Sequence, residues 1–315
     1  MRWLITGGCG FIGSALVERL TSQGAAALRI VDDLSSGTKE ALHDVAKPSD
    51  TIELTVGTVL DEQLAIRLAA GVDVIVHLAA NTGVAPSIEN PRADFMTNVL
   101  GTLNYLEAAR QCAVPHFVFA SSGASVGDVT PPIHEELPPR PVSPYGAGKA
   151  AGEAYCAAYA RAFGIKTVAL RFANVYGPRS SHKESLVAKF IRQALAGEPL
   201  EVYGDGHQTR DFIAVGDLVE AIVRAAVADV AGEVFQIATN RETTVKEIAD
   251  RLKALIDPLG VTPPVKVVYG PARRGDVRRN VADVGKAQRL LGWQPRTSIE
   301  DGLALTLRWF LSSSR

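Results

Sequence analysis

Short apolar segments alternate with longer segments of helical periodicity through the first half of the chain. The apolar segments show little alternation with polar residues, as in the sequence DVIVHL at Asp73–Leu78. Strands that are apolar on both faces lie inside parallel sheets covered by helices. The predicted strands are Trp3–Thr6, Leu28–Val31, Thr51–Val56, Asp73–Leu78, His116–Ala120 and Lys166–Phe172, and the predicted helices between them are Phe11–Gln23, Asp61–Ala70, Asp94–Cys112 and Pro144–Phe163. This order predicts an α/β fold with a doubly wound parallel sheet.

The pattern changes after about Ala173, where segments become shorter and richer in Gly, Pro and charge. Helical periodicity continues at Leu186–Ala196, Val215–Ala228, Thr244–Ile256 and Ile299–Leu311. We therefore expect one domain over residues 1–173 and a smaller C-terminal lobe over residues 174–315, with some later segments returning to the first domain.

Composition narrows the class of protein. The 315 residues, 47% hydrophobic and 21% charged, suit a folded protein of about two domains. The net charge of −1 argues against a nucleic-acid-binding surface, and the apolar runs are too short for a membrane span. The N-terminus has no signal-peptide pattern and Cys9, Cys112 and Cys156 are widely spaced, so we expect a cytoplasmic protein with reduced thiols. His77 and His207 lack metal-ligand spacing, and we expect no metal.

A Gly-rich turn joins the first predicted strand to the first predicted helix. Thr6–Gly13 reads TGGCGFIG, where Gly7 permits a tight turn, Gly10 admits a pyrophosphate and Gly13 allows close packing of helix and strand. The helix N-terminus favours phosphate. Asp32 ends the second strand, where a carboxylate binds a ribose hydroxyl and favours NAD over NADP. A purely structural turn is the alternative, but the strand, the helix and the acid together favour a dinucleotide site.

Tyr145 and Lys149 lie four residues apart at the start of a predicted helix and therefore share one face. An ammonium near the phenol, with NAD⁺ close by, favours the phenolate and lowers the pKa of Tyr145, which can then exchange a proton with an alcohol or ketone. Ser121 and Ser122 follow the strand His116–Ala120, where a hydroxyl can hold the substrate oxygen. Alone, Tyr145 and Lys149 would fit an ordinary surface pair. Together with the Gly-rich turn, they favour chemistry.

Taken together, these motifs resemble the extended short-chain dehydrogenase/reductase family, in particular its nucleotide-sugar epimerases. The motifs are TGGCGFIGS at 6–14, HLAA at 77–80, SS at 121–122, YGAGK at 145–149, LRFANVYGPR at 170–179, GDGHQTRDFIAVGDL at 204–218, ARRGD at 272–276 and LLGWQP at 290–295. The resemblance covers almost the whole chain. It implies a Rossmann-like NAD-binding domain, a smaller C-terminal α/β substrate-binding lobe and a homodimer formed by Asp94–Cys112 and Pro144–Phe163.

The resemblance also implies roles for individual residues. The residues implied at NAD are Gly7, Gly10, Phe11, Ile12, Asp32, Ala79, Ala80, Asn98, Tyr145 and Lys149. The implied catalytic residues are Ser122, Tyr145 as the base, and Lys149 on the nicotinamide ribose. The residues implied at a UDP-sugar substrate are Ser122, Tyr145, Asn174, Arg210, Arg273 and Asp276, the last four at its diphosphate and ribose.

The implied reaction is NAD-dependent 4-epimerisation of a UDP-hexose of the UDP-glucose/UDP-galactose type through a 4-keto intermediate. Gly123 and Ala124 stand where related dehydratases and decarboxylases carry acids, which favours a neutral sugar. Val126 and Thr58 depart from the family pattern near the sugar and the adenine. The alternatives are a UDP-glucuronate 4-epimerase, a nucleotide-sugar 4-keto reductase or dehydrogenase, and a non-catalytic nucleotide-sensing protein.

Overall fold

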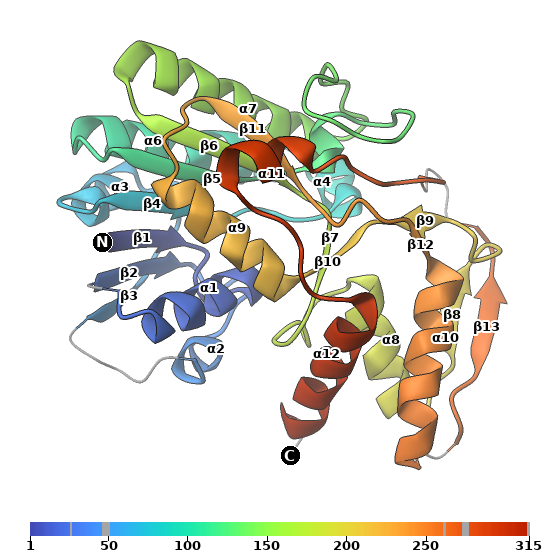
Figure 1. The fold of residues 1–315 in the computed structure, drawn as a ribbon. Coiled ribbons are helices and arrows are strands. Elements are labelled where there is room, and N and C mark those ends of the chain that lie inside the picture. The colour runs from blue at the N-terminus through green and yellow to red at the C-terminus, as the bar shows by residue number, and fades with distance from the viewer. Residues whose placement is uncertain (26, 46–50, 261–262, 273–276, 314–315) are drawn as a thin grey trace.

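A seven-stranded parallel sheet forms the larger part of the molecule (Figure 1). The computed structural model describes residues 1–315 except 26, 46–50, 261–262, 273–276 and 314–315. The strand order is β11-β6-β5-β4-β1-β2-β3, and every neighbouring pair is parallel. The strands are β1 (Arg2–Thr6), β2 (Ala27–Asp32), β3 (Ile52–Val56), β4 (Val74–His77), β5 (His116–Ser122), β6 (Lys166–Phe172) and β11 (Glu233–Ile237). This is the predicted doubly wound Rossmann-type architecture.

Helices cover both faces of the sheet, as the apolar strands require. On one face, α1 (Phe11–Ser22) and α9 (Val215–Val227) pack over a core that includes Leu16, Ile222 and Trp293. On the other face, α3 (Glu62–Ala69), α6 (Gly101–Gln111) and α7 (Pro144–Phe163) pack over Phe117 and Phe119. The shorter helices are α2 (Lys39–His43), α4 (Val84–Glu89), α5 (Pro91–Phe95) and α11 (Gly285–Leu291).

The C-terminal lobe has its own core around Tyr176, Phe190 and Ile248. Its described residues contain three small two-stranded sheets and three α-helices, and it lies beside the main sheet at the lower right of Figure 1. The paired strands are β7 (Asn174–Tyr176) with β10 (Phe212–Ala214), β8 (Leu200–Tyr203) with β13 (Val267–Gly270), and β9 (Thr209–Arg210) with β12 (Thr243–Thr244). The helices are α8 (Leu186–Leu195), α10 (Val245–Ile256) and α12 (Ile299–Ser313).

Two features of the main domain differ from the sequence expectation. The strand β11, from the C-terminal half, joins the sheet beside β6 although no strand was predicted there. The predicted helix Asp94–Cys112 is interrupted by a π-helical turn at Met96–Leu100 between α5 and α6. The wider turn carries Asn98, whose buried side chain bonds to the loop that follows β4.

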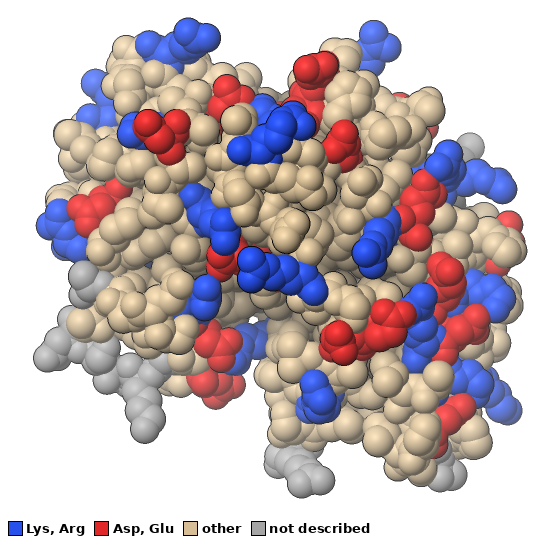
Figure 2. Space-filling model, in the orientation of Figure 1, with Lys and Arg blue, Asp and Glu red and all other residues tan. Residues whose placement is uncertain are grey.

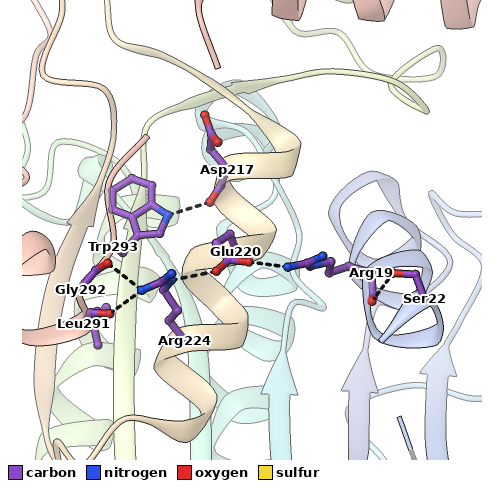
Figure 3. Close-up of polar contacts among 8 residues, drawn as sticks. All are labelled: Arg19, Ser22, Asp217, Glu220, Arg224, Leu291, Gly292 and Trp293. Atoms are coloured by element: carbon purple, nitrogen blue, oxygen red, sulfur yellow. Dashed lines mark hydrogen bonds and ion pairs between the residues drawn. The ribbon is translucent and has the colours of Figure 1, made fainter. Parts of the chain in front are cut away.

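The helix α9 connects the two parts of the molecule (Figure 3). Trp293, 1% exposed, donates from its indole Nε1 to the backbone oxygen of Asp217, 2.9 Å away. The Asp217 carboxylate accepts from the backbone N–H groups of Arg296 and Thr297. These contacts explain the LLGWQP motif structurally, because they dock the chain that leads into α12 onto α9.

A chain of ion pairs continues from α9 to α1 (Figure 3). Arg224 donates to the backbone oxygens of Leu291 and Gly292 and to Glu220 Oε1, and Arg19 donates to Glu220 Oε2 at 2.9 Å. The helix α1 that follows the Gly-rich turn is thus tied through α9 to the segment before α12.

Candidate active site

The Gly-rich turn between β1 and α1 has the geometry of an anion site. Gly7 has φ +69°, and a Cβ there would lie 2.8 Å from Ala79 N. A Cβ at Gly13 would lie 2.2 Å from Gly7 O, so the close packing of α1 on the turn requires glycine. Gly10 is the N-cap of α1, and Phe11 and Ile12 begin the helix. The predicted conformational roles of Gly7 and Gly13 are confirmed, and the start of α1 favours a phosphate group.

Asp32 lies beside this turn at the end of β2 and is 8% exposed. Its carboxylate accepts from the backbone N–H groups of Cys9 and Leu34, each at 2.9 Å. Burial raises the pKa of Asp32, and these two hydrogen bonds act in the opposite direction. The carboxylate therefore lies against the Gly-rich turn, where the sequence predicts a contact with a ribose hydroxyl.

The loop after β4 is held in place from two sides. Thr6 Oγ1 accepts from Ala79 N at 3.0 Å and also contacts His77 Nδ1. Asn98 donates to Asn81 O and accepts from Asn81 N, which fixes the chain just after Ala79 and Ala80. Asn98 is 1% exposed, so the structure shows it supporting this loop, while its contact with a cofactor stays a prediction.

His77 and His207 lie in different surroundings. His77 is 1% exposed and stacks near Phe117 and Phe119, and burial lowers its pKa to about 3, which keeps it neutral. His207 is exposed. Within the described part of the chain, no group of three or more His, Cys, Asp or Glu side chains forms a candidate metal site.

The predicted catalytic residues come together where β5 meets the start of α7. Ser143 caps α7 by accepting from Gly146 N, and Pro144 occupies the first turn, so the helix begins just before Tyr145. Tyr145 and Ser122 are hydrogen bonded to each other. Lys149 is 3% exposed and donates from Nζ to the backbone oxygen of Ala120 at 2.7 Å.

The pKa values differ in one respect from the expectation. Burial lowers the pKa of Lys149 to about 8, opposed by the negative charges of Asp94 and Glu153. Burial also raises the pKa of Tyr145, the Ser122 hydrogen bond lowers it, and Asp94 raises it further. The predicted lowering by Lys149 is therefore not found, because Nζ is turned to Ala120 and lies 5.8 Å from the centre of the Tyr145 ring.

A cavity of about 350 Å³ lies in the C-terminal lobe, and its lining starts at the residue after β6. In the register of β5 and β6, Ser122 pairs with Phe172, and the next residues, Ala173 and Asn174, line the cavity. The remaining lining residues are Val175, Tyr176, Ser185, Leu186, Val187, Tyr203, Gln208, Arg210, Phe212 and Val245. The structure thus brings two predicted substrate residues, Asn174 and Arg210, together in one cavity, whose lining starts one residue beyond the strand partner of Ser122.

The polar residues of this cavity are already ordered. Arg210 donates to the backbone oxygens of Thr209 and Val277 at 2.7 and 2.6 Å, so its guanidinium is held in one orientation. Asn174 donates to Asp211 O at 3.3 Å. Arg273 and Asp276 lie outside the described residues.

A second cavity, of about 310 Å³, lies between α1, α9, α12 and the segment Gly177–Arg179. Charged side chains around it pair with one another, as Arg179 does with Glu18 and Arg19 with Glu220, each at 2.9 Å. On the face drawn in Figure 2, positive and negative side chains are interspersed. The first cavity, which contains Asn174 and Arg210, is therefore the better candidate for a substrate site.

Sequence reasoning missed three buried charged residues around the catalytic group. Glu153 follows Lys149 by one helical turn, Arg171 lies within the apolar strand β6, and Asp94 in α5 acts on Lys149. The spacing 145, 149 and 153 on one helix face and the charge of Arg171 within the otherwise apolar end of β6 were the available signals.

Comparison with known proteins now gives the family. Residues 3–238 match the model of the NAD dependent epimerase/dehydratase family. The chain belongs to this family. It is 40% identical over 320 residues to a UDP-glucose 4-epimerase of Mycolicibacterium smegmatis, with 100% of both chains covered. A dTDP-glucose 4,6-dehydratase of Xanthomonas campestris is 34% identical over 329 residues, which cover 99% of this chain and 93% of that one.

Two solved structures of UDP-glucose 4-epimerases are similar to this chain over almost its whole length. The UDP-glucose 4-epimerase of Thermotoga maritima with UDP-glucose has a TM-score of 0.91 and 37% identity, with 100% of both chains covered. The complex of Thermus thermophilus UDP-glucose 4-epimerase with NAD has a TM-score of 0.88 and 34% identity, covering 99% of this chain and 100% of that one. The cofactor of this family member is NAD. The turn at Gly7–Gly13, the start of α1 and the Asp32 carboxylate fit its pyrophosphate and ribose.

Proposed function

We propose that the protein is a 4-epimerase of a UDP-hexose of the UDP-glucose/UDP-galactose type and acts through a transient 4-keto sugar. The observation that carries the proposal is that Ser122, Tyr145 and Lys149 meet where β5 ends and α7 begins. Asn174 and Arg210 share the 350 Å³ cavity, whose lining starts one residue beyond the strand partner of Ser122. A nucleotide sugar whose nucleotide occupies the cavity would present its sugar to Tyr145.

Tyr145 exchanges the proton of the sugar's 4-hydroxyl, removing it when the ketone forms and returning it when the alcohol is restored. Ser122 is hydrogen bonded to Tyr145 and can donate to the same sugar oxygen. NAD, when bound, supplies a reversible acceptor for the hydrogen and electron pair of C4, and a positive charge that favours the phenolate. The raised pKa of Tyr145 makes that positive charge necessary.

Lys149 supplies a buried positive charge beside the Tyr145 ring and, by the family resemblance, a hydrogen bond to the nicotinamide ribose. Its pKa of about 8 leaves it mostly protonated at neutral pH. In the protonated state it has further donors besides the one that binds Ala120 O.

Residues in the cavity and next to it would anchor the substrate. Asn174 and Arg210, with Arg273 and Asp276, are proposed to hold the diphosphate and ribose of UDP. A guanidinium already fixed by Thr209 O and Val277 O binds a phosphate oxygen with little further ordering. A nucleotide held in this way lets the sugar turn over between removal and return of the C4 hydrogen.

The turn after Ser122 favours epimerisation over elimination or decarboxylation. A Cβ at Gly123 would meet nothing within 4 Å, and Ala124 follows it, so this space holds no acid from either position. A second proton donor or acceptor for C5 or C6 chemistry is therefore missing at the position where the resemblance places it.

Assembly as a homodimer and a cytoplasmic location are part of the same proposal. The apolar side chains of Phe95 in α5 and of Tyr155 and Phe163 in α7 are 54, 39 and 51% exposed, which supports a contact through this region. Among the described helices, none combines the length and apolarity needed to cross a bilayer. The oligomeric state follows from light scattering of the purified protein.

The test is incubation of the purified protein with UDP-glucose, UDP-galactose, their N-acetylated forms and UDP-glucuronate, without added cofactor, followed by chromatography. We expect interconversion of the neutral pair, no net change in reduced nicotinamide, and loss of turnover with retained UDP binding in Tyr145→Phe. Turnover that needs added NAD(P)H would favour a reductase, conversion of UDP-glucuronate alone would favour the uronate epimerase, and binding without turnover would favour a sensing protein.

A further inference from the structure

A buried carboxylate accepts hydrogen bonds from two serines that lie on either side of Ser122 in the sequence. Glu153 in α7, 6% exposed, lies one helical turn beyond Lys149. Its Oε1 accepts from Ser121 Oγ at 2.5 Å and from Ser125 Oγ at 3.0 Å. These two serines flank Ser122, so the end of β5 and the 3₁₀ turn after it are both attached to α7 through one carboxylate.

Arg171 of β6 completes this arrangement. Its side chain is 3% exposed and binds Glu153 through two hydrogen bonds, Nε to Oε1 at 2.8 Å and Nη2 to Oε2 at 2.7 Å. Removing two charges from water is costly, and apolar residues in place of such a pair often leave stability unchanged or improved. A buried pair is therefore weak evidence for a stabilising role and leaves open a role in geometry.

The contacts of Glu153 lie directly beside those of the catalytic group, along the end of β5. Along the end of β5, Ala120 O accepts from Lys149, and Ser122 bonds to Tyr145. The strand residue between them, Ser121, bonds to Glu153. Three successive strand residues are thus matched to the helix face that carries positions 145, 149 and 153.

We propose that Glu153, held by Arg171, is a positioning residue that fixes Ser122 against Tyr145. This inference rests on the proposed function, in which Ser122 and Tyr145 act on one sugar oxygen. Without the carboxylate, the turn Gly123–Ser125 loses its attachment through Ser125, and the Ser122 hydroxyl loses its fixed direction. A displacement of about 1 Å in a catalytic group can reduce the rate by about a hundredfold.

Glu153 also acts on Lys149 through its charge. The groups that face Lys149 are Asp94 from α5, Tyr145 and Glu153 from α7, and His77 from β4. Asp94 and Glu153 raise the pKa of Lys149 against the effect of burial, and His77 is neutral. In Glu153→Gln the pKa of Lys149 falls below about 8, because one negative charge is lost while Arg171 stays positive. The alkaline limb of the kcat profile then moves to lower pH.

The experiment compares two variants with a matched control in the epimerisation assay. Ser125→Ala removes one hydrogen bond and keeps the ion pair, and Glu153→Gln removes the charge. The control, Thr167→Val, removes another buried hydrogen bond between a strand and α7, from Thr167 Oγ1 to Cys156 O at 2.7 Å, away from the catalytic end.

We expect kcat to fall about tenfold in Ser125→Ala and more in Glu153→Gln, with KM for the UDP-sugar unchanged. The alkaline limb moves only in Glu153→Gln, and Thr167→Val retains kcat within about twofold. Wild-type kcat in Ser125→Ala and Glu153→Gln, or an equal loss in Thr167→Val, overturns the proposal.

A readout that needs no substrate separates this proposal from the proposed function. The Ser122 hydrogen bond lowers the pKa of Tyr145, so a misplaced Ser122 raises it. The phenolate absorbance of Tyr145, taken as the difference from Tyr145→Phe, should titrate at higher pH in Ser125→Ala than in wild type, and an unchanged titration overturns the proposal. Ser125→Ala retains the ion pair between Glu153 and Arg171, so this variant tests the proposal even where Glu153→Gln does not fold. A wild-type protein that epimerises no UDP-sugar refutes the proposed function only.

Discussion

Replacement of Lys149 by Met is expected to stabilise the protein while abolishing activity. Burial lowers the pKa of Lys149 from its usual 10.5 to about 8, and a lowering of that size corresponds to about 3 kcal/mol of unfavourable free energy for the folded ammonium. Met has a similar length and no charge, but it leaves Ala120 O without its donor, which costs about 1 kcal/mol. The net expectation is a gain of about 2 kcal/mol in the free energy of unfolding near neutral pH.

The pH dependence of this gain has a definite sign. The folded-state pKa lies below the unfolded-state value, so the folded protein releases its proton first as pH rises. The unfavourable term is fully present below a pH of about 8 and disappears as pH approaches 10.5. The stability difference between Lys149→Met and wild type should therefore shrink across that window.

Urea unfolding followed by circular dichroism, on both proteins freed of dinucleotide, measures the difference at about pH 7 and about pH 10. Lys189→Met is the matched control, because Lys189 pairs with Glu201 at 2.9 Å and its pKa is raised, so this variant should lose stability. A Lys149→Met protein less stable than wild type at neutral pH, or a gain that does not change with pH, would refute the reasoning.

Three further predictions concern the turn, the ribose site and the connection between the two parts of the molecule. Gly13→Ala should lower the free energy of unfolding in urea by about 1–3 kcal/mol, because its Cβ would lie 2.2 Å from Gly7 O. Gly216→Ala, with open space around its Cβ, should leave this free energy unchanged, and equal effects of the two variants would contradict the reasoning. Asp32→Asn should weaken NAD about tenfold in a fluorescence titration, since a charged hydrogen bond to the ribose is lost, and unchanged affinity would remove Asp32 from the site. Trp293→Phe should lose about 1 kcal/mol or more of stability with its hydrogen bond to Asp217 O, which thermal melts check, and a neutral result would contradict the docking role.

The sheet could be predicted because its strands are apolar on both faces. The six predicted strands are present. The strand β11 was missed because two of its five residues, Glu233 and Gln236, are polar, and within the described residues it lies at the edge of the sheet beside β6. The π-helical turn in front of α6 was also missed. Periodicity over Asp94–Cys112 suits an unbroken helix, and the π-helical turn coincides with a tertiary contact between Asn98 and Asn81 that the sequence does not reveal.

The sequence motifs predicted which residues come together in the site. Ser122, Tyr145 and Lys149 meet as the spacing and strand end suggested, and Asn174 and Arg210 share one cavity. The pKa direction of Tyr145 could not be predicted, because it depends on burial and on where Lys149 Nζ points. The cluster of Ser125, Glu153 and Arg171 could not be predicted either, because the packing of β5 against β6 and α7 is visible only in three dimensions.

The central claim is that the hydrogen removed from C4 returns to C4 of the same sugar while Tyr145 handles only the hydroxyl proton. UDP-glucose deuterated at C4 tests this directly, with the position of the label in the product read by NMR. The account predicts UDP-galactose that keeps its deuterium at C4, formed without added cofactor and absent in Tyr145→Phe. Deuterium lost to water, moved to another carbon or transferred to added NAD would contradict it.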